Sequence, residues 1–343
     1  MTFLEMGNRP NFLPRAEALR GLAALAVLGF HATSTGYDLI ATGLAPVVVF
    51  FVLSGFLLSK SLDHNPDVIR FLRHRAFRLL PAAIAAVTLL TGLYWQFGFY
   101  LYLPNFEPFN LVLNALLLCS DINPPMWSLT VEVAAIPVIL ASHRLFRAQG
   151  YLPLACLAVV LFGLSFWGAY VHALGYFTNL APLYSFVVGM LGYFYSRALQ
   201  ERFISRRLTQ IIELAALALI CVAALRKQTA YTILAETISA TVLLVLVAST
   251  TRRTVLGALL DTEIIKFFGR ISYSFFLLHM IGVGLAVRML PVLPSLLYVI
   301  LVFAIAVVVT TPIAWLFWRY IEVPFIRFGK EWLPSTRRAA PAE

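Results

Sequence analysis

The chain of 343 residues is 61% hydrophobic and only 12% charged. Soluble domains are about 45–50% apolar and about 25% charged, so this composition excludes an ordinary soluble protein. The formal net charge of +10 does not by itself indicate a nucleic-acid partner, because membrane proteins collect basic residues in their cytoplasmic loops. Long apolar runs such as residues 297–318 lack the alternation of a transmembrane β-barrel strand. They predict an all-α integral membrane protein.

The apolar runs predict about ten transmembrane helices in a single membrane domain that covers residues 1–343. The predicted spans are residues 18–37, 43–60, 79–100, 127–143, 152–171, 179–196, 209–225, 231–249, 268–290 and 296–318. Residues 101–126, between the third and fourth spans, contain the apolar run LVLNALLLCS, which is too short to cross a bilayer comfortably. The breaker DINPPM follows this run, so we expect a re-entrant or interfacial segment here.

Basic residues set the predicted orientation. The segments expected on the cytoplasmic side share a high content of arginine and lysine: residues 61–78, 144–151, 197–208, 250–267 and the C-terminal tail. The outer side holds only Arg226 and Lys227, with Arg288 near it. This asymmetry follows the positive-inside rule. We therefore predict a multi-pass protein of a bacterial inner membrane, with residues 1–17 and 319–343 as short cytoplasmic termini.

The first predicted helix carries Arg20 and His31, separated by ten apolar residues. Eleven steps of about 100° amount to three turns plus about 20°, so both side chains face the same way, about 16 Å apart along the axis. A neutral imidazole at that depth is a candidate general base, since the reference pKa of histidine is about 6.5. The alternative is a packing histidine with an arginine that reaches toward the membrane surface.

Two further polar segments flank the third span. Arg70, Arg73, Arg75 and Arg78 precede it and form either a topology anchor or a phosphate-binding site. Glu132 lies five residues after Trp127 in the fourth span. A carboxylate at that depth needs a partner. It could orient the deep histidine, bind a hydroxyl or pair with an arginine, whereas Trp127 alone is typical of a membrane interface.

The last two spans also carry polar residues. Ser272, Tyr273, Ser274 and His279 stand in the ninth span, where hydrogen bonding between helices is the alternative to a binding site. Glu322, in the sequence YIEVP, is expected to mark a helix stop with an interfacial charge. The cysteines and histidines have no metal-ligand spacing, so no metal site is expected.

Taken in chain order, these segments resemble the membrane-bound acyltransferase-3 family, which includes O-antigen acetylases. The quoted motifs are the arginine–histidine pair of RAEALRGLAALAVLGFH, then VVFFVLSGFLLS, RAFRLLPA, WSLTVE, ISYSFFLLH and YIEVP. Two departures stand out. Glu17 replaces the more usual aspartate, and VAAI replaces an aromatic pair after Glu132.

The resemblance implies an acyltransferase that moves an acyl group, expected to be acetyl, from cytoplasmic acyl-CoA to a hydroxyl. The expected acceptor is an extracytoplasmic or lipid-linked glycan, glycolipid or glycoside, as in O-acetylation of a polysaccharide. The catalytic residues implied are His31 and Glu132. Arg20, Arg75 and Arg78 are expected to bind the phosphates of CoA. The supporting or substrate-binding set is Trp127, Ser128, Ser272, Tyr273, His279 and Glu322.

A membrane transporter or flippase for a glycan or other small polar substrate is the alternative function, because buried polar groups also line translocation paths. The sequence shows no paired inverted repeats with broken helices, which many transporters have. A structural or sensor membrane protein is a third class, and it would tolerate His31→Ala.

Overall fold

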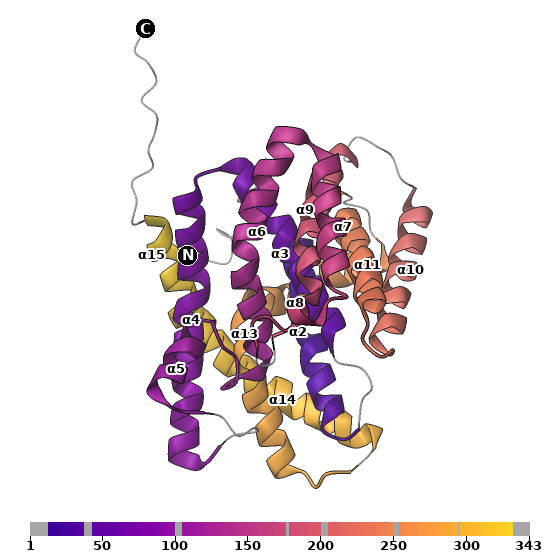
Figure 1. Cartoon of the computed structure of the whole chain (residues 1–343). Helices are drawn as coiled ribbons and strands as arrows, with labels where there is room; N and C mark the ends of the chain where they lie inside the picture. Colours follow the sequence, from indigo (N-terminus) through magenta and orange to yellow (C-terminus); the bar gives the residue numbers. More distant parts are fainter. Residues whose placement is uncertain are drawn as a thin grey trace.

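The computed structural model describes residues 13–37, 43–99, 105–175, 178–199, 205–249, 254–293 and 295–331. All regular secondary structure in these ranges is helical, which confirms the all-α prediction (Figure 1). The outer parts of the two predicted termini, residues 1–12 and 332–343, lie outside the described residues.

Each of the ten predicted spans overlaps a helix. These helices are α2 (Pro14–Ser34), α3 (Leu44–His64), α4 (Val68–Phe97), α6 (Trp127–Gln149), α7 (Tyr151–Leu164), α9 (Tyr184–Leu199), α10 (Arg206–Ala224), α11 (Ala230–Ser249), α13 (Glu263–Met289) and α14 (Leu296–Phe317). The shorter elements are α5 (Pro108–Ala115), η1 (Pro124–Met126), α8 (Gly168–Val171), η2 (Ala181–Leu183), α12 (Val255–Leu260), η3 (Trp318–Glu322) and α15 (Val323–Glu331). The span predicted at 152–171 is divided between α7 and the short α8.

Seven helices in the described part of the chain are long and apolar enough to cross a membrane. The ten predicted crossings therefore stay a prediction. Helix α7 has only 14 residues and α9 only 16, and about 20 residues are needed to span the hydrocarbon core. Helix α5 has eight residues, so it is about 12 Å long and cannot cross. This length agrees with a re-entrant or interfacial segment between the third and fourth predicted spans.

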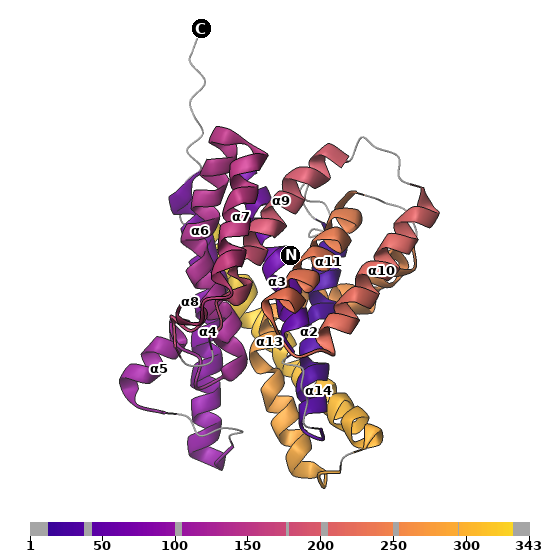
Figure 2. The ribbon, with the colours of Figure 1, turned by 45° about the vertical axis from the view of Figure 1, so that its right-hand side comes forward.

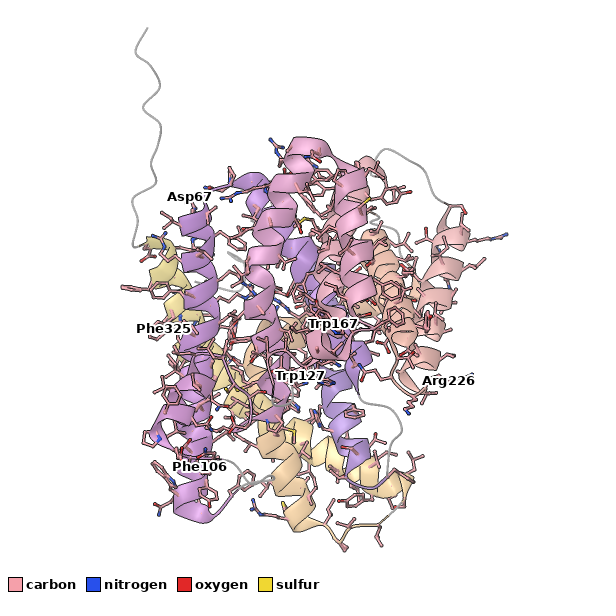
Figure 3. All side chains as sticks on the ribbon, in the orientation of Figure 1. Asp67, Phe106, Trp127, Trp167, Arg226 and Phe325 are labelled. Atoms are coloured by element: carbon pink, nitrogen blue, oxygen red, sulfur yellow. The ribbon has the colours of Figure 1, made fainter. Side chains whose placement is uncertain are left out.

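Helices α2, α3 and α13 lie at the centre of the bundle. Helices α4, α5, α6 and α7 cover one side of this centre, and α10 and α11 cover the other (Figures 1 and 2). Asp67 lies at one end of the bundle and Phe106 at the other, with Trp127 between them (Figure 3). The loop at Asp67 belongs to the side predicted to face the cytoplasm.

Glycines allow two central helix pairs to touch through their backbones. A Cβ added to Gly21 would lie 2.5 Å from the backbone nitrogen of Gly269, so α2 and α13 meet without a side chain between them. A Cβ on Gly55 would lie 2.0 Å from the carbonyl oxygen of Phe186, which brings α3 against α9 in the same way. Close backbone approach at small residues is the usual basis of helix packing inside membranes.

Two differences from the predicted helix boundaries change the surroundings of polar residues. The arginine-rich segment is part of α4 and not a loop before it, because Asp67 caps the helix and its side chain accepts a hydrogen bond from the backbone N–H of Arg70 at 3.1 Å. The last span also does not stop at YIEVP. It passes through the π-helical turn η3 and continues as α15 to Glu331, and Pro324 follows directly after this turn, where the hydrogen-bond register has changed.

Candidate functional site

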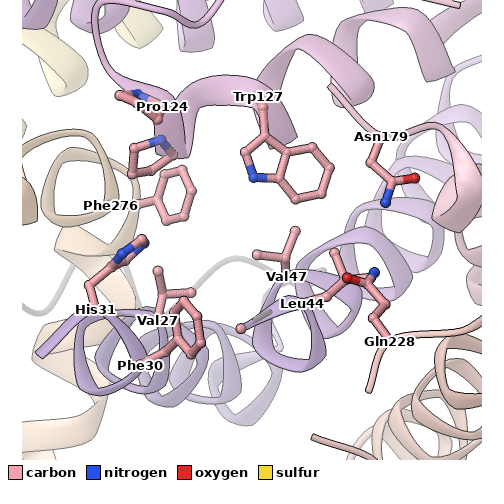
Figure 4. Close-up of a pocket in the computed structure, with 12 residues that line it drawn as sticks. Val27, Phe30, His31, Leu44, Val47, Pro124, Trp127, Asn179, Gln228 and Phe276 are labelled. Carbon is pink, nitrogen blue, oxygen red and sulfur yellow. The ribbon is translucent and has the colours of Figure 1, made fainter. Parts of the chain in front are cut away.

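A cavity of about 300 Å³ lies beside the last turn of α2 and is named here the His31 chamber. Its lining includes His31, Trp127 at the first residue of α6, and Phe276 of α13. Figure 4 shows His31 and Phe276 on one side of the chamber, with Asn179 and Gln228 on the opposite side. Trp127, which alone was typical of a membrane interface, lines this cavity together with the predicted base. The chamber has the volume of a small-molecule site.

His31 has a second histidine as its neighbour. The ring centroids of His31 and His279 are 5.1 Å apart. His279 is 1% exposed, and its Nδ1 lies 2.6 Å from the carbonyl oxygen of Phe276. A carbonyl oxygen only accepts, so Nδ1 is the protonated nitrogen and Nε2 is left as an acceptor. That Nε2 is buried and has no hydrogen-bond partner within the described residues.

Glu132 forms a buried ion pair with Arg75. The guanidinium Nη2 of Arg75 lies 2.5 Å from Oε1 of Glu132, and the hydroxyl of Ser54 donates to the same oxygen at 2.7 Å. Arg75 is 5% exposed and Glu132 is 7% exposed. Of the three roles that the sequence left open for Glu132, the structure shows pairing with an arginine. Ser54 belongs to a quoted motif, yet sequence reasoning gave it no role in the site.

Arg20 lines a smaller cavity next to the His31 chamber. This cavity of about 30 Å³ is also lined by Ser54, Glu132, Ser272 and Phe276, among others. Phe276 lines both cavities, so the two are neighbours. Arg20 and Glu132 interact electrostatically across this region. The structure therefore places Arg20, Ser272 and Glu132 together, one cavity away from His31.

The remaining predicted hydroxyls already have partners. The O–H of Tyr273 donates to the backbone carbonyl of Leu79 at 2.7 Å, so this group is not aimed at the His31 chamber. The hydroxyl of Ser128 donates to the carbonyl of Pro125 at 3.2 Å. The Tyr273 bond joins α13 to α4, whereas the Ser128 bond is local to the first turn of α6.

Glu322 is buried, at 4% exposed, and is not an interfacial charge. It accepts a hydrogen bond from the hydroxyl of Ser274 at 3.0 Å and is attracted by Arg78. The π turn η3 makes this possible because it changes the helix register at YIEVP. Glu322 therefore makes a buried polar contact between α13 and η3. The prediction of a helix stop with an interfacial charge at YIEVP was wrong.

A polar network that sequence reasoning missed holds the segment between α4 and α6. The side-chain amides of Asn110 and Asn114 donate to Asp121 at 2.5 Å and 2.7 Å, and the backbone N–H of Ile122 donates to Asn114 Oδ1 at 3.1 Å. Asn123 then donates to the carbonyl of Leu277 on α13 at 2.8 Å. These bonds position Pro124 and Trp127 over the His31 chamber. The two asparagines on α5 were the available signal.

The histidines, cysteines, aspartates and glutamates that the structure describes form no group of three or more able to hold a metal. What the fold presents is a helical membrane bundle with a histidine pair at a cavity and a buried arginine–glutamate pair beside it. These features are typical of polytopic membrane proteins that bind a small molecule inside the helical bundle.

Comparison with known proteins gives the family. The chain belongs to the acyltransferase-3 family, whose acyltransferase domain matches residues 14–319. It is also similar to BcsY of Komagataeibacter xylinus, a protein named as a proposed membrane-bound transacylase, with 38% identity over 82 residues. That match covers 23% of this chain and 20% of the relative, so the chain matches only a fifth of that protein's length. No solved structure matches.

The family predicted from the motifs is therefore confirmed, and with it an acyltransferase at the level of the family. The match spans the helices that carry the His31 chamber and the Arg75–Glu132 pair. Together with the apolar helices, it also supports a multi-pass membrane protein.

Proposed function

We propose that this protein transfers an acyl group, expected to be acetyl, from acyl-CoA to a hydroxyl of a glycan, glycolipid or glycoside, with His31 as the general base. The observation that carries the proposal is the His31–His279 pair at a cavity in a chain of the acyltransferase-3 family. Acyl-CoA enters from the cytoplasmic side of a bacterial inner membrane, and the acceptor is used at the far side.

In this mechanism the acceptor hydroxyl and the thioester meet in the His31 chamber. His31 takes the hydroxyl proton as the oxygen attacks the thioester carbonyl. The tetrahedral intermediate then collapses, the C–S bond breaks, and His31 returns the proton to the CoA sulfur. The products are the O-acyl ester and free CoA, so atoms and charge balance. The apolar walls at Phe276 and Trp127 limit water around the thioester and so limit its hydrolysis.

His279 acts in the proposal as a positioning residue for His31. Its Nδ1–H is held by the Phe276 carbonyl, which fixes the ring and leaves Nε2 as an acceptor close to the His31 ring. Glu132 holds Arg75 and Ser54, so its expected contribution is to order the smaller cavity next to the chamber. Arg20 also lines that smaller cavity.

The test uses membranes with matched amounts of wild-type protein, His31→Ala and the control His172→Ala, whose side chain is exposed outside the chamber. Free CoA release is measured from a panel of acyl-CoAs, with and without a glycan extract. Because general base catalysis contributes about 10²–10⁴-fold, CoA release should fall by at least about 100-fold in His31→Ala only. Equal release from all three would remove His31 as the base. Uptake or flipping of a glycan without acyl-CoA would favour a transporter.

A further inference from the structure

A second, strongly basic cavity lies at the Asp67 end of the bundle, away from the His31 chamber. It has a volume of about 420 Å³ and is named here the basic pocket. Its charged lining comes from Lys60 on α3, Arg70 on α4 and Lys330 on α15, with His64 and His74 beside them. The described residues that line this pocket include no aspartate or glutamate. Several basic side chains around one cavity create a local positive potential that favours a multivalent anion.

The pocket is built by the packing of α15 on α4. The rings of Phe77 and Phe328 meet edge to face at a centroid distance of 5.5 Å. A Cβ on Gly329 would lie 2.7 Å from the Cβ of Phe77, so the two helices are in close contact. This contact depends on the π turn that lets the last span continue past Pro324, and it carries Lys330 to the side of Arg70.

One face of α3 contributes lining residues to the His31 chamber, the smaller cavity and the basic pocket. Val47 lines the chamber, Ser54 lines the smaller cavity, and Ser61 lines the basic pocket. These three residues are spaced by seven, which is close to two helical turns, so they lie on the same face of the helix. The distance from Val47 to Ser61 along the axis is about 21 Å. An extended acyl-phosphopantetheine arm is of comparable length.

Arg75, in contrast, is used inside the protein. Its guanidinium is buried and bonded to Glu132, at the level of Ser54 between the two large cavities. The guanidinium of Arg75 already donates to a buried carboxylate. It could bind a phosphate with the same N–H groups only by leaving that carboxylate unpaired. Arg70, one helical turn earlier on α4, is exposed and lines the basic pocket.

We infer that the basic pocket binds the phosphate-bearing nucleotide end of acyl-CoA, with Lys60 and Arg70 as its main phosphate contacts. The pantetheine arm then follows the Val47–Ser54–Ser61 face of α3 and passes the Arg75–Glu132 pair, and the thioester reaches His31. The inference rests on the proposed function. It places the phosphates on Lys60 and Arg70 in place of the motif arginine Arg75.

The test measures equilibrium binding of CoA, dephospho-CoA and phosphatidylglycerol to the purified full-length protein in detergent. The variants are Arg70→Ala and Lys60→Ala. The control is Arg144→Ala, an exposed arginine in a neighbouring cavity of about 440 Å³ at the same end of the molecule. We expect the dissociation constant for CoA to rise about tenfold or more in each pocket variant and to stay unchanged in Arg144→Ala.

Steady-state kinetics give the second readout. The KM for acyl-CoA should rise in Arg70→Ala while kcat stays close to that of the wild type, because the phosphates do not take part in the chemical step. A short acyl-pantetheine donor, which lacks the nucleotide, should react equally with both proteins.

Three results would overturn the inference. If Arg70→Ala and Lys60→Ala both bind CoA as tightly as Arg144→Ala does, the basic pocket is not the CoA site. The proposed function is unaffected by that result. If Arg70→Ala weakens the binding of phosphatidylglycerol but not the binding of CoA, the pocket is a lipid site. Wild-type protein that binds no CoA at all would remove the proposed function together with the pocket.

Discussion

Separating the two members of the Arg75–Glu132 pair should destabilise the protein unequally. In Arg75→Met the carboxylate of Glu132 keeps the hydroxyl of Ser54 and the electrostatic attraction of Arg20. In Glu132→Leu, Arg75 loses its ion pair and the attraction between Arg20 and Glu132 is lost as well. The loss of the carboxylate should therefore be the more costly change.

The magnitude follows from burial and distance. Both side chains are less than a tenth exposed and their charged atoms are 2.5 Å apart. Removing one member of such a pair costs about 3–5 kcal/mol, because the other charge is left buried. We expect about 3 kcal/mol for Arg75→Met and about 5 kcal/mol for Glu132→Leu, the two ends of that range. The double variant carries no unpaired charge from this pair, so its cost should be well below the sum.

The assay is reversible unfolding in mixed micelles, with the free energy extrapolated linearly to zero denaturant. The four proteins form a double-mutant cycle. A coupling energy of at least about 2 kcal/mol is expected, since residues in direct contact within one network couple by up to about 3 kcal/mol. Additivity within about 0.5 kcal/mol, or a larger cost for Arg75→Met than for Glu132→Leu, would refute the assignment of this pair as a buried structural unit.

Two further predictions concern packing and the cover of the chamber. Gly55→Ala places a methyl group 2.0 Å from the Phe186 carbonyl and should lower the unfolding free energy by about 1–3 kcal/mol, as overpacking does. Gly92→Ala, which meets nothing within 4 Å, is the matched control, and equal stability of the two variants would contradict the backbone contact. Asn114→Ala removes three side-chain hydrogen bonds, to Asn110, Asp121 and Ile122, so the KM for the acceptor should rise while CoA binding stays unchanged. If the KM for the acceptor were the same as in the wild type, the Asn114 network would not be needed to shape the His31 chamber.

The sequence predicted the class, the approximate positions of the long helices and the place of His31 on the first of them, because each rests on a local property. Apolar runs identify helices wherever they pack. Arg20 and His31 could be placed on one face from helical geometry alone. His279 and Glu132 stood out as polar residues within apolar spans, although the spacing along the chain does not show which residue each of them meets.

The pairing of those residues required the fold. His31 and His279 are 248 positions apart and meet only because α2 and α13 pack through glycines. Arg75 reaches Glu132 because it lies within α4, which begins at Val68. The first turns of α4 are rich in arginine, so hydropathy alone does not place them in the helix. The proline after Glu322 suggested a helix end, whereas a π turn that no simple periodicity reveals carries the chain onward.

The contact between Gly21 and Gly269 has a mechanical consequence. Sliding α2 along α13 would bring a larger residue against the facing backbone at this contact, so we expect the two helices to move as one rigid body. His31 and His279 both belong to this body, so the spacing between their rings is preserved during motions of the rest of the bundle. If the chamber widens to admit an acceptor, we expect its other walls to move. These walls are the start of α3 and the Pro124–Trp127 turn before α6.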